Sequence, residues 1–304
     1  MTLRTAVNAS LRLLATAAVG ALIGAALAAS ADAQQSHPQP ARAVPTKPAP
    51  PAPAVTGGAP ATAEVSRRPT LGGYLGVQRL PDFRVFLPPP PAAGSPLAVA
   101  DGTIFDETRK LENGPRWQLA ASDDRINMKA LLGDFGCSTG LDLSSVDAPA
   151  ITRVIVRSSA DLFPLIGASK DAYKRPRPFS EREGPICVMP SDELKASPSY
   201  PSGHAATGWL YALLLAEIDP AHADAIVQRG RAFGESRVVC GVHYYSDIEG
   251  GRMAATALVA ALHGAPEFET DIASARAELF SLRGKAQPAD AACESEKSNL
   301  ATPW

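Results

Sequence analysis

The 304-residue chain has few aromatic residues and no excess of positive charge. Phe, Trp and Tyr together make up 6% of it, alanine is abundant, and the apolar/polar alternation typical of strands is almost absent. This composition favours helices over a β-sandwich. The formal net charge is −2, so the chain lacks the basic surplus that gives general affinity for nucleic acid.

Several motifs of metal and thiol chemistry are also missing. The absence of a Cys-x-x-Cys pair disfavours a thiolate zinc site or a thioredoxin-type site. The absence of His-Glu-x-x-His disfavours a zinc protease. An even number of cysteines predicts up to two disulfides in an oxidising compartment, and three pairings are open. The cysteines are Cys137, Cys187, Cys240 and Cys293.

The N-terminal part differs in composition from the rest. Residues 1–33 combine Arg4 and Arg12 with an apolar run and end in Ala-Asp-Ala, which predicts a secretory signal peptide cleaved after Ala33. A retained membrane anchor is the alternative. Residues 34–70 are rich in Pro and Ala and are predicted to form a disordered tether. We therefore expect a periplasmic or secreted protein with no stable membrane span after signal removal.

The remaining chain is predicted to form one all-α helical bundle domain at residues 71–285, followed by a C-terminal tail at 286–304. Apolar residues recur there at helical spacing, and loops with Pro, Gly and charges separate the helices. Ser246 and Glu249 have the spacing of a capping box. Helices are expected at about 151–166, with Asp147 and Pro149 as start signals, and at about 203–218, 221–233 and 246–263. This arrangement puts the polar motifs in loops at helix ends.

The first polar segment places Lys170, Lys174, Arg175 and Arg177 close together around two prolines. Guanidinium forks and ammonium groups in such a turn suit the oxygens of a phosphate. Taken alone, this segment is explained more simply as a solvated, charged helix end.

The second segment, Pro201-Ser202-Gly203-His204, immediately precedes an apolar helix. Glycine allows close backbone approach, and a helix N-terminus attracts anions through free N–H groups. His204 is then placed to give a proton to a leaving group. A plain helix cap with an incidental histidine is the alternative.

The third segment runs from Ser236-Arg237 to His243 and Asp247. One helical turn brings the carboxylate of Asp247 to the imidazole, fixing its tautomer and leaving the other ring nitrogen free to attack. A core histidine satisfied by a capping aspartate is the alternative.

Together the segments resemble the three-part signature of the type 2 phosphatidic acid phosphatase superfamily, K-x6-R-P, P-S-G-H and S-R-x5-H-x3-D. Over residues 71–265 the chain is most similar to the class A bacterial nonspecific acid phosphatases. The resemblance implies that His243 attacks phosphorus, Asp247 orients it, and His204 protonates the leaving alcohol. It further implies that phosphate is held by Lys170, Arg177, Ser202, Gly203 and Arg237.

The resemblance also implies a reaction without metal or cofactor, because three cations and a helix start replace the metal charge. Phosphomonoesters are the expected substrates, and inorganic phosphate or vanadate the expected inhibitors. The ordinary pKa of histidine, near 6.5, predicts an acidic pH optimum with a bell-shaped profile. Relatives often form dimers or larger assemblies, so a homo-oligomer is compatible with the resemblance.

Three alternatives stay open from the sequence. A vanadium-dependent haloperoxidase shares the same constellation and differs by oxidising halide with peroxide. A lipid phosphate phosphatase shares it too, although such enzymes usually carry membrane helices. A secreted binding or structural module is compatible with the helices and cysteines but leaves the three motifs unexplained.

Overall fold

The computed structural model describes residues 72–76 and 79–301, and no strand occurs among them, which confirms the all-α prediction. The predicted signal peptide (1–33) and tether (34–70) lie outside the described residues. The helices are α1 (Phe83–Phe86), α2 (Pro96–Arg109), α3 (Pro115–Ser122), α4 (Met128–Asp134), α5 (Gly136–Thr139), α6 (Pro149–Tyr173), α7 (Pro178–Glu181), α8 (Asp192–Ala196), α9 (Gly203–Ile218), η2 (Pro220–His222), α10 (Ala223–Val239), α11 (Tyr245–Leu262), α12 (Pro266–Leu282) and α13 (Asp290–Leu300).

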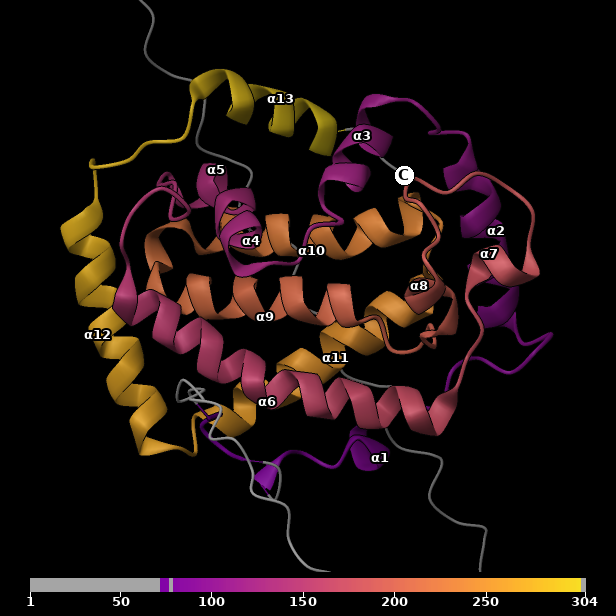
Figure 1. The fold of residues 1–304 in the computed structure, drawn as a ribbon, viewed down its shortest axis with the longest axis horizontal. Helices are drawn as coiled ribbons and strands as arrows, with labels where there is room; N and C mark the ends of the chain where they lie inside the picture. Colours follow the sequence, from indigo (N-terminus) through magenta and orange to yellow (C-terminus); the bar gives the residue numbers. More distant parts are fainter. Residues whose placement is uncertain (1–71, 77–78, 302–304) are drawn as a thin grey trace, which may run out of the picture. The chain divides into compact units, whose positions relative to one another are not determined.

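Helix α9 is the central element of the domain. It packs against α6, α10, α11 and α12, and Figure 1 shows it running between α10 and α6. Its sequence is apolar around the whole circumference, as expected of a helix enclosed on all sides. Close approach of α10 depends on Gly230, where an added Cβ would lie 2.2 Å from the Cβ of Ala212. The N-terminus of this central helix carries Ser202 and Gly203, so the core fixes their position.

Helix α6 ends at the first cationic segment. It begins at Pro149, as the sequence predicted, and continues beyond the expected end to Tyr173. The next residue, Lys174, adopts a left-handed conformation with φ of 49° and donates its N–H to the carbonyl of Lys170. This cap stops the helix and turns the chain toward Arg177, because the following Arg-Pro-Arg-Pro stretch cannot continue a helix.

Helices α10 and α11 differ from the sequence prediction at their facing ends. Helix α10 runs to Val239, so Arg237 lies in its last turn and not in a loop. Helix α11 begins at Tyr245, and the carboxylate of Asp247 caps it by accepting the N–H of Tyr244 at 2.8 Å. The predicted capping box from Ser246 to Glu249 is therefore wrong by two residues, because the helix starts earlier than its serine suggested.

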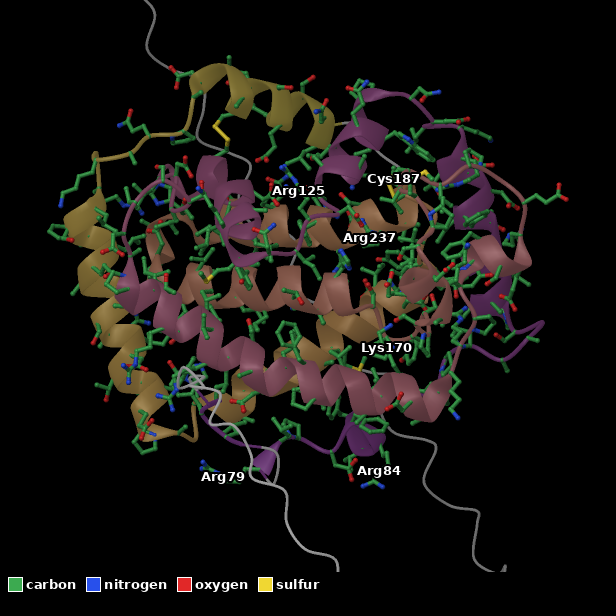
Figure 2. All side chains as sticks on the ribbon, in the orientation of Figure 1. Arg79, Arg84, Arg125, Lys170, Cys187 and Arg237 are labelled. Carbon is green, nitrogen blue, oxygen red and sulfur yellow. A yellow bond between two sulfur atoms is a disulfide. The ribbon has the colours of Figure 1, made fainter. Side chains whose placement is uncertain are left out.

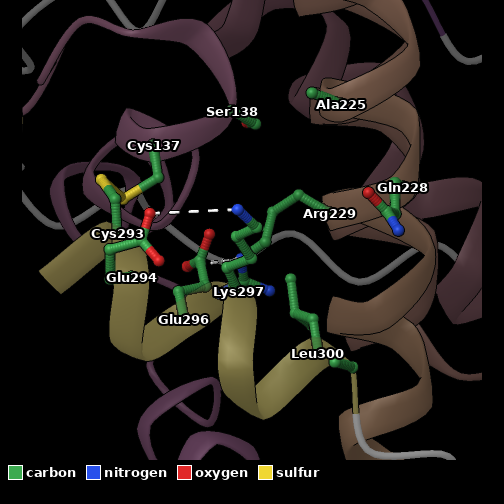
Figure 3. Close-up of a pocket in the computed structure, with 11 residues that line it drawn as sticks. Cys137, Ser138, Ala225, Gln228, Arg229, Cys293, Glu294, Glu296, Lys297 and Leu300 are labelled. Atoms are coloured by element: carbon green, nitrogen blue, oxygen red, sulfur yellow. Dashed lines mark hydrogen bonds and ion pairs between the residues drawn. A yellow bond between two sulfur atoms is a disulfide. The ribbon is translucent and has the colours of Figure 1, made fainter. Parts of the chain in front are cut away.

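Two disulfides join elements that are distant in sequence. Cys187 pairs with Cys240 and ties the loop after α7 to the end of α10. Cys137 pairs with Cys293 and attaches α13 to α5. The segment expected to be a C-terminal tail thus contains a helix covalently held to the domain. A cavity of about 450 Å³ lies between α13 and α10, where Arg229 contacts Glu296 at 3.1 Å (Figure 3).

Across residues 72–76 and 79–301, no helix is both long enough and apolar enough to cross a membrane.

Candidate active site

The first cationic segment folds back toward the start of α11. Arg177 is buried and donates through Nε to the carbonyl of Ser197 and through Nη1 to that of Val242, both at 2.9 Å. Lys170, in the last turn of α6, donates to the carbonyl of Pro198. These bonds hold both cations against the chain just before the second motif and hold Arg177 against Val242 within the third.

The second motif forms the N-terminus of α9. Ser202 is the N-cap: its hydroxyl accepts the N–H of Ala205 at 3.2 Å. Its own N–H donates to the carbonyl of Asp247 at 2.9 Å. Gly251 of α11 lets the two helices come this close, since a Cβ there would lie 2.5 Å from the carbonyl oxygen of Ser202. The helix starts that carry the second and third motifs are therefore in direct contact.

His243 lies buried between a guanidinium and a carboxylate. Its Nε2 is 3.1 Å from Nη1 of Arg177, and its Nδ1 is 3.4 Å from Oδ2 of Asp247. A guanidinium has donors only, so Nε2 must carry the lone pair and Nδ1 the proton. The neutral imidazole consequently presents its free electron pair toward the cationic side of the site.

Asp247 is held by donors from three separate segments. Arg175 donates to Oδ1 at 2.7 Å, and Ser199 donates to Oδ2 at 2.5 Å, in addition to the N–H of Tyr244. Arg175 also bridges to the buried carboxylate of Asp101 at 2.9 Å. Because its oxygens are fixed in this way, Asp247 can orient the Nδ1–H of His243.

Arg237 reaches the site from the last turn of α10. Its side chain is 1% exposed, and Nη2 donates to Oδ1 of Asp124 at 2.7 Å. Within the part of the chain that the structure describes, its Nε and Nη1 have no hydrogen-bond partner. Buried unpaired donors are rare, and two on one guanidinium indicate a place for an anion. Figure 2 labels Arg237 on α10 and Lys170 on α6, the two helices that flank α9.

His204, the second residue of α9, lies beside Asp124 in the loop between α3 and α4. Its Nε2 is 3.0 Å from the carbonyl oxygen of Asp124, which can only accept, so Nε2 carries a proton. Burial and the charges of Arg237, Arg177 and Lys170 lower its pKa to about 3.

The positive charge of the site affects every titratable group around it. Burial, followed by the charges of Arg177, Lys170, Arg237 and His204, holds the pKa of His243 well below its ordinary value. Burial and the charge of Arg177 lower the pKa of Lys170 to about 8. The cations proposed from the first and third motifs thus lower the pKa values of both histidines, and the site holds more positive charge than negative. Such a surplus suits a multiply charged anion.

Comparison with known proteins agrees with this arrangement. The family model described as the PAP2 superfamily matches residues 154–270. An acid phosphatase of Zymomonas mobilis is 41% identical over 219 residues, which cover 71% of this chain and 83% of that protein. The chain belongs to the PAP2 superfamily. A non-specific acid phosphatase of Providencia stuartii is 36% identical over 222 residues, 72% of this chain and 89% of that one. One of Salmonella typhimurium is 33% identical over 197 residues, 64% and 78% respectively.

Sequence reasoning missed four residues of this PAP2 site. Arg175, Ser199 and Asp101 support Asp247, directly or through Arg175, and Asp124 contacts both Arg237 and His204. Arg175 was named as part of the cationic segment, but no feature of the sequence distinguished its role from that of Lys174. The other three residues lie outside the three motifs, and only folding places them next to the site.

One short match in this PAP2 member carries no chemistry. Residues 136–140 have the spacing Gly-x-Ser-x-Gly of a serine hydrolase elbow. Ser138 lies buried in α5, and its hydroxyl donates to the carbonyl of Phe135 at 2.9 Å. Its hydroxyl is therefore part of a helix turn and not an exposed nucleophile.

Proposed function

We propose that the protein is an exported, metal-independent acid phosphatase that hydrolyses phosphomonoesters through a phosphohistidine on His243. The observation that carries the proposal is the neutral imidazole of His243 facing Arg177, beside a buried Arg237 with two unpaired donors. The names of the relatives, acid phosphatase and non-specific acid phosphatase, support the same activity.

In the first half-reaction, Nε2 of His243 attacks phosphorus as the bond to the leaving oxygen breaks. Lys170, Arg177 and Arg237, with Ser202 and the N–H groups at the start of α9, neutralise the three equatorial oxygens. Phosphoryl transfer depends mainly on such charge stabilisation, so three cations and a helix N-terminus supply what metal ions supply elsewhere. His204 gives its proton to the leaving alkoxide, and Asp247 stabilises the charge that develops on the ring of His243.

In the second half-reaction, water attacks the phosphorus of the phosphohistidine. His204, now neutral, takes a proton from this water, and the P–N bond breaks. The electron pair returns to Nε2 of His243, and inorganic phosphate leaves. Each group ends in its initial state, as a catalytic cycle requires.

His204 acquires its proton with the substrate in this scheme. Without bound substrate, the pKa of His204 is about 3, because burial and three cations disfavour another positive charge. A phosphate dianion placed among those cations contributes the opposite charge and so raises the pKa of His204 in the complex. The acidic optimum therefore depends on the bound substrate and does not follow from the ordinary pKa of histidine alone.

Export is supported by the two disulfides as well as by the predicted leader. Disulfides persist in oxidising compartments such as the bacterial periplasm and are rare in the cytosol. All four cysteines of the chain are paired.

Hydrolysis of p-nitrophenyl phosphate, measured against pH with EDTA present, tests the proposed function. We expect turnover that EDTA leaves unchanged and that continues well below pH 6.5, because His243 stays neutral there. We also expect kcat/KM to fall as the pH rises through about 8, since Lys170 then loses its charge. Loss of activity in EDTA, restored by a divalent metal, contradicts the cation-based site. Peroxide-dependent halide oxidation after addition of vanadate, without phosphatase turnover, favours the haloperoxidase instead.

A further inference from the structure

The contact between Asp124 and Arg237 occupies a position that the phosphate needs. A guanidinium grips an oxyanion through one of two forks, Nε with Nη2 or Nη1 with Nη2, because Cδ lies between Nε and Nη1. Both forks include Nη2, which supplies one hydrogen to each fork and donates one of them to Asp124 at 2.7 Å. The two remaining nitrogens are buried and unpaired. The Asp124 oxygen thus fills one of the two forks, on the side of His204, whose Nε2 lies 3.8 Å from the same oxygen. A phosphate that contacts Arg237 in this fork while its leaving oxygen faces His204 therefore requires Asp124 to give way.

The backbone beside Asp124 is firmly anchored. Its neighbour Asp123 is fully buried and accepts from Arg229 at 2.7 and 3.3 Å and from the hydroxyl of Ser236 at 2.6 Å. Ser236 directly precedes Arg237 on α10. This network therefore fixes the position of the Asp123–Asp124 loop relative to Arg237. The position of Asp124 over Arg237 is thus built into the fold.

The side chain of Asp124, in contrast, is free to leave. It is 42% exposed, whereas the side chain of Arg237 is 1% exposed. Among the described residues, the only other side chain paired with this carboxylate within 4 Å is His204, whose Nε2 lies 3.8 Å from Oδ1. Rotation of one carboxylate into solvent opens the fork, without movement of the anchored backbone.

We propose that the Asp124 carboxylate is an internal anion that occupies the phosphate-binding fork of Arg237 and is displaced by the phosphate group. The proposal rests on the proposed function, because it assumes that phosphate binds at Arg237. It makes Asp124 a residue that sets the affinity of the site: the competing carboxylate weakens binding of the product and so speeds its release. It also keeps the buried guanidinium partly neutralised between turnovers.

Exchange of Asp124 for asparagine tests the proposal with almost no change in shape. We expect Asp124→Asn to remain active and to bind inorganic phosphate about 3–10-fold more tightly, measured as the competitive inhibition constant against p-nitrophenyl phosphate. Vanadate inhibition should tighten in parallel, and KM should fall more than kcat changes. The matched control is Asp106→Asn, which removes the same charge from another Asp–Arg pair, at 2.6 Å from Arg182. That variant should keep the wild-type inhibition constants.

Unchanged or weaker phosphate inhibition in a folded, active Asp124→Asn protein overturns the proposal and leaves the phosphatase function intact. A second measurement needs no variant: a structure of the wild-type protein with vanadate bound. We expect vanadate on Nη2 of Arg237 and the Asp124 carboxylate turned away. Vanadate at Arg237 with Asp124 still on Nη2 contradicts the displacement. A wild-type protein that neither hydrolyses the ester nor binds phosphate removes the proposed function and this inference together.

Discussion

Replacing His243 with alanine is expected to lower kcat for p-nitrophenyl phosphate by at least about 10⁴-fold. The physical reason is that Nε2 of His243 is the nitrogen that presents a lone pair to the cationic side of the site, 3.1 Å from Nη1 of Arg177. Without it, the cations still bind the ester but nothing attacks phosphorus. Steady-state kinetics with the purified variant measures the loss, and vanadate binding by calorimetry should persist.

The matched control for this variant is His263→Ala. His263 lies at the end of α11 between two carboxylates, 2.5 Å from Glu269 and 3.4 Å from Glu217, and has no place in the proposed chemistry. Its removal should leave kcat unchanged. A His243→Ala protein that retains activity within tenfold of the wild type would remove His243 from the mechanism.

The second large effect concerns His204 and depends on the substrate. We expect His204→Ala to lower kcat/KM by about 10²–10⁴-fold for an alkyl phosphate, because an alkoxide is a poor leaving group without a proton. The loss should be much smaller for p-nitrophenyl phosphate, whose leaving phenolate is stable unprotonated. Measuring both esters with one protein preparation separates proton transfer from binding or folding defects.

Equal losses with the two esters would show that His204 does something other than protonate the leaving group. A loss caused by misfolding also affects both esters equally, so the thermal unfolding temperature is measured on the same sample. A wild-type unfolding temperature with equal losses then counts against the general-acid assignment itself.

Much of the helical fold was predictable because its signals are local. The starts at Pro149 and Gly203 follow from proline at the first helical position and from the serine cap. The apolar run after Gly203 predicted an apolar helix over 203–218, and α9 occupies that range at the centre of the domain. The ends were less well predicted: burial against α9 extends α10 through Arg237, and no local residue marks that continuation.

The supporting network of the site was not predictable from one sequence. Asp101 and Asp247 are 146 residues apart in number, and Arg175 joins them by contacts at 2.9 and 2.7 Å. The disulfide pairing was open for the same reason, since only the fold brings Cys137 to Cys293. The lowered pKa of His204 was not predictable from the sequence either, because it results from burial and from cations that lie far from His204 in the chain.

Rapid quenching of the wild-type protein during turnover of a radiolabelled phosphomonoester tests the nucleophile most directly. The account predicts labelled protein within a single turnover, with a phosphoryl group that survives alkali, is lost in acid, and maps by mass spectrometry to the peptide containing His243. Turnover without labelled protein, or a label on any other residue, would contradict it.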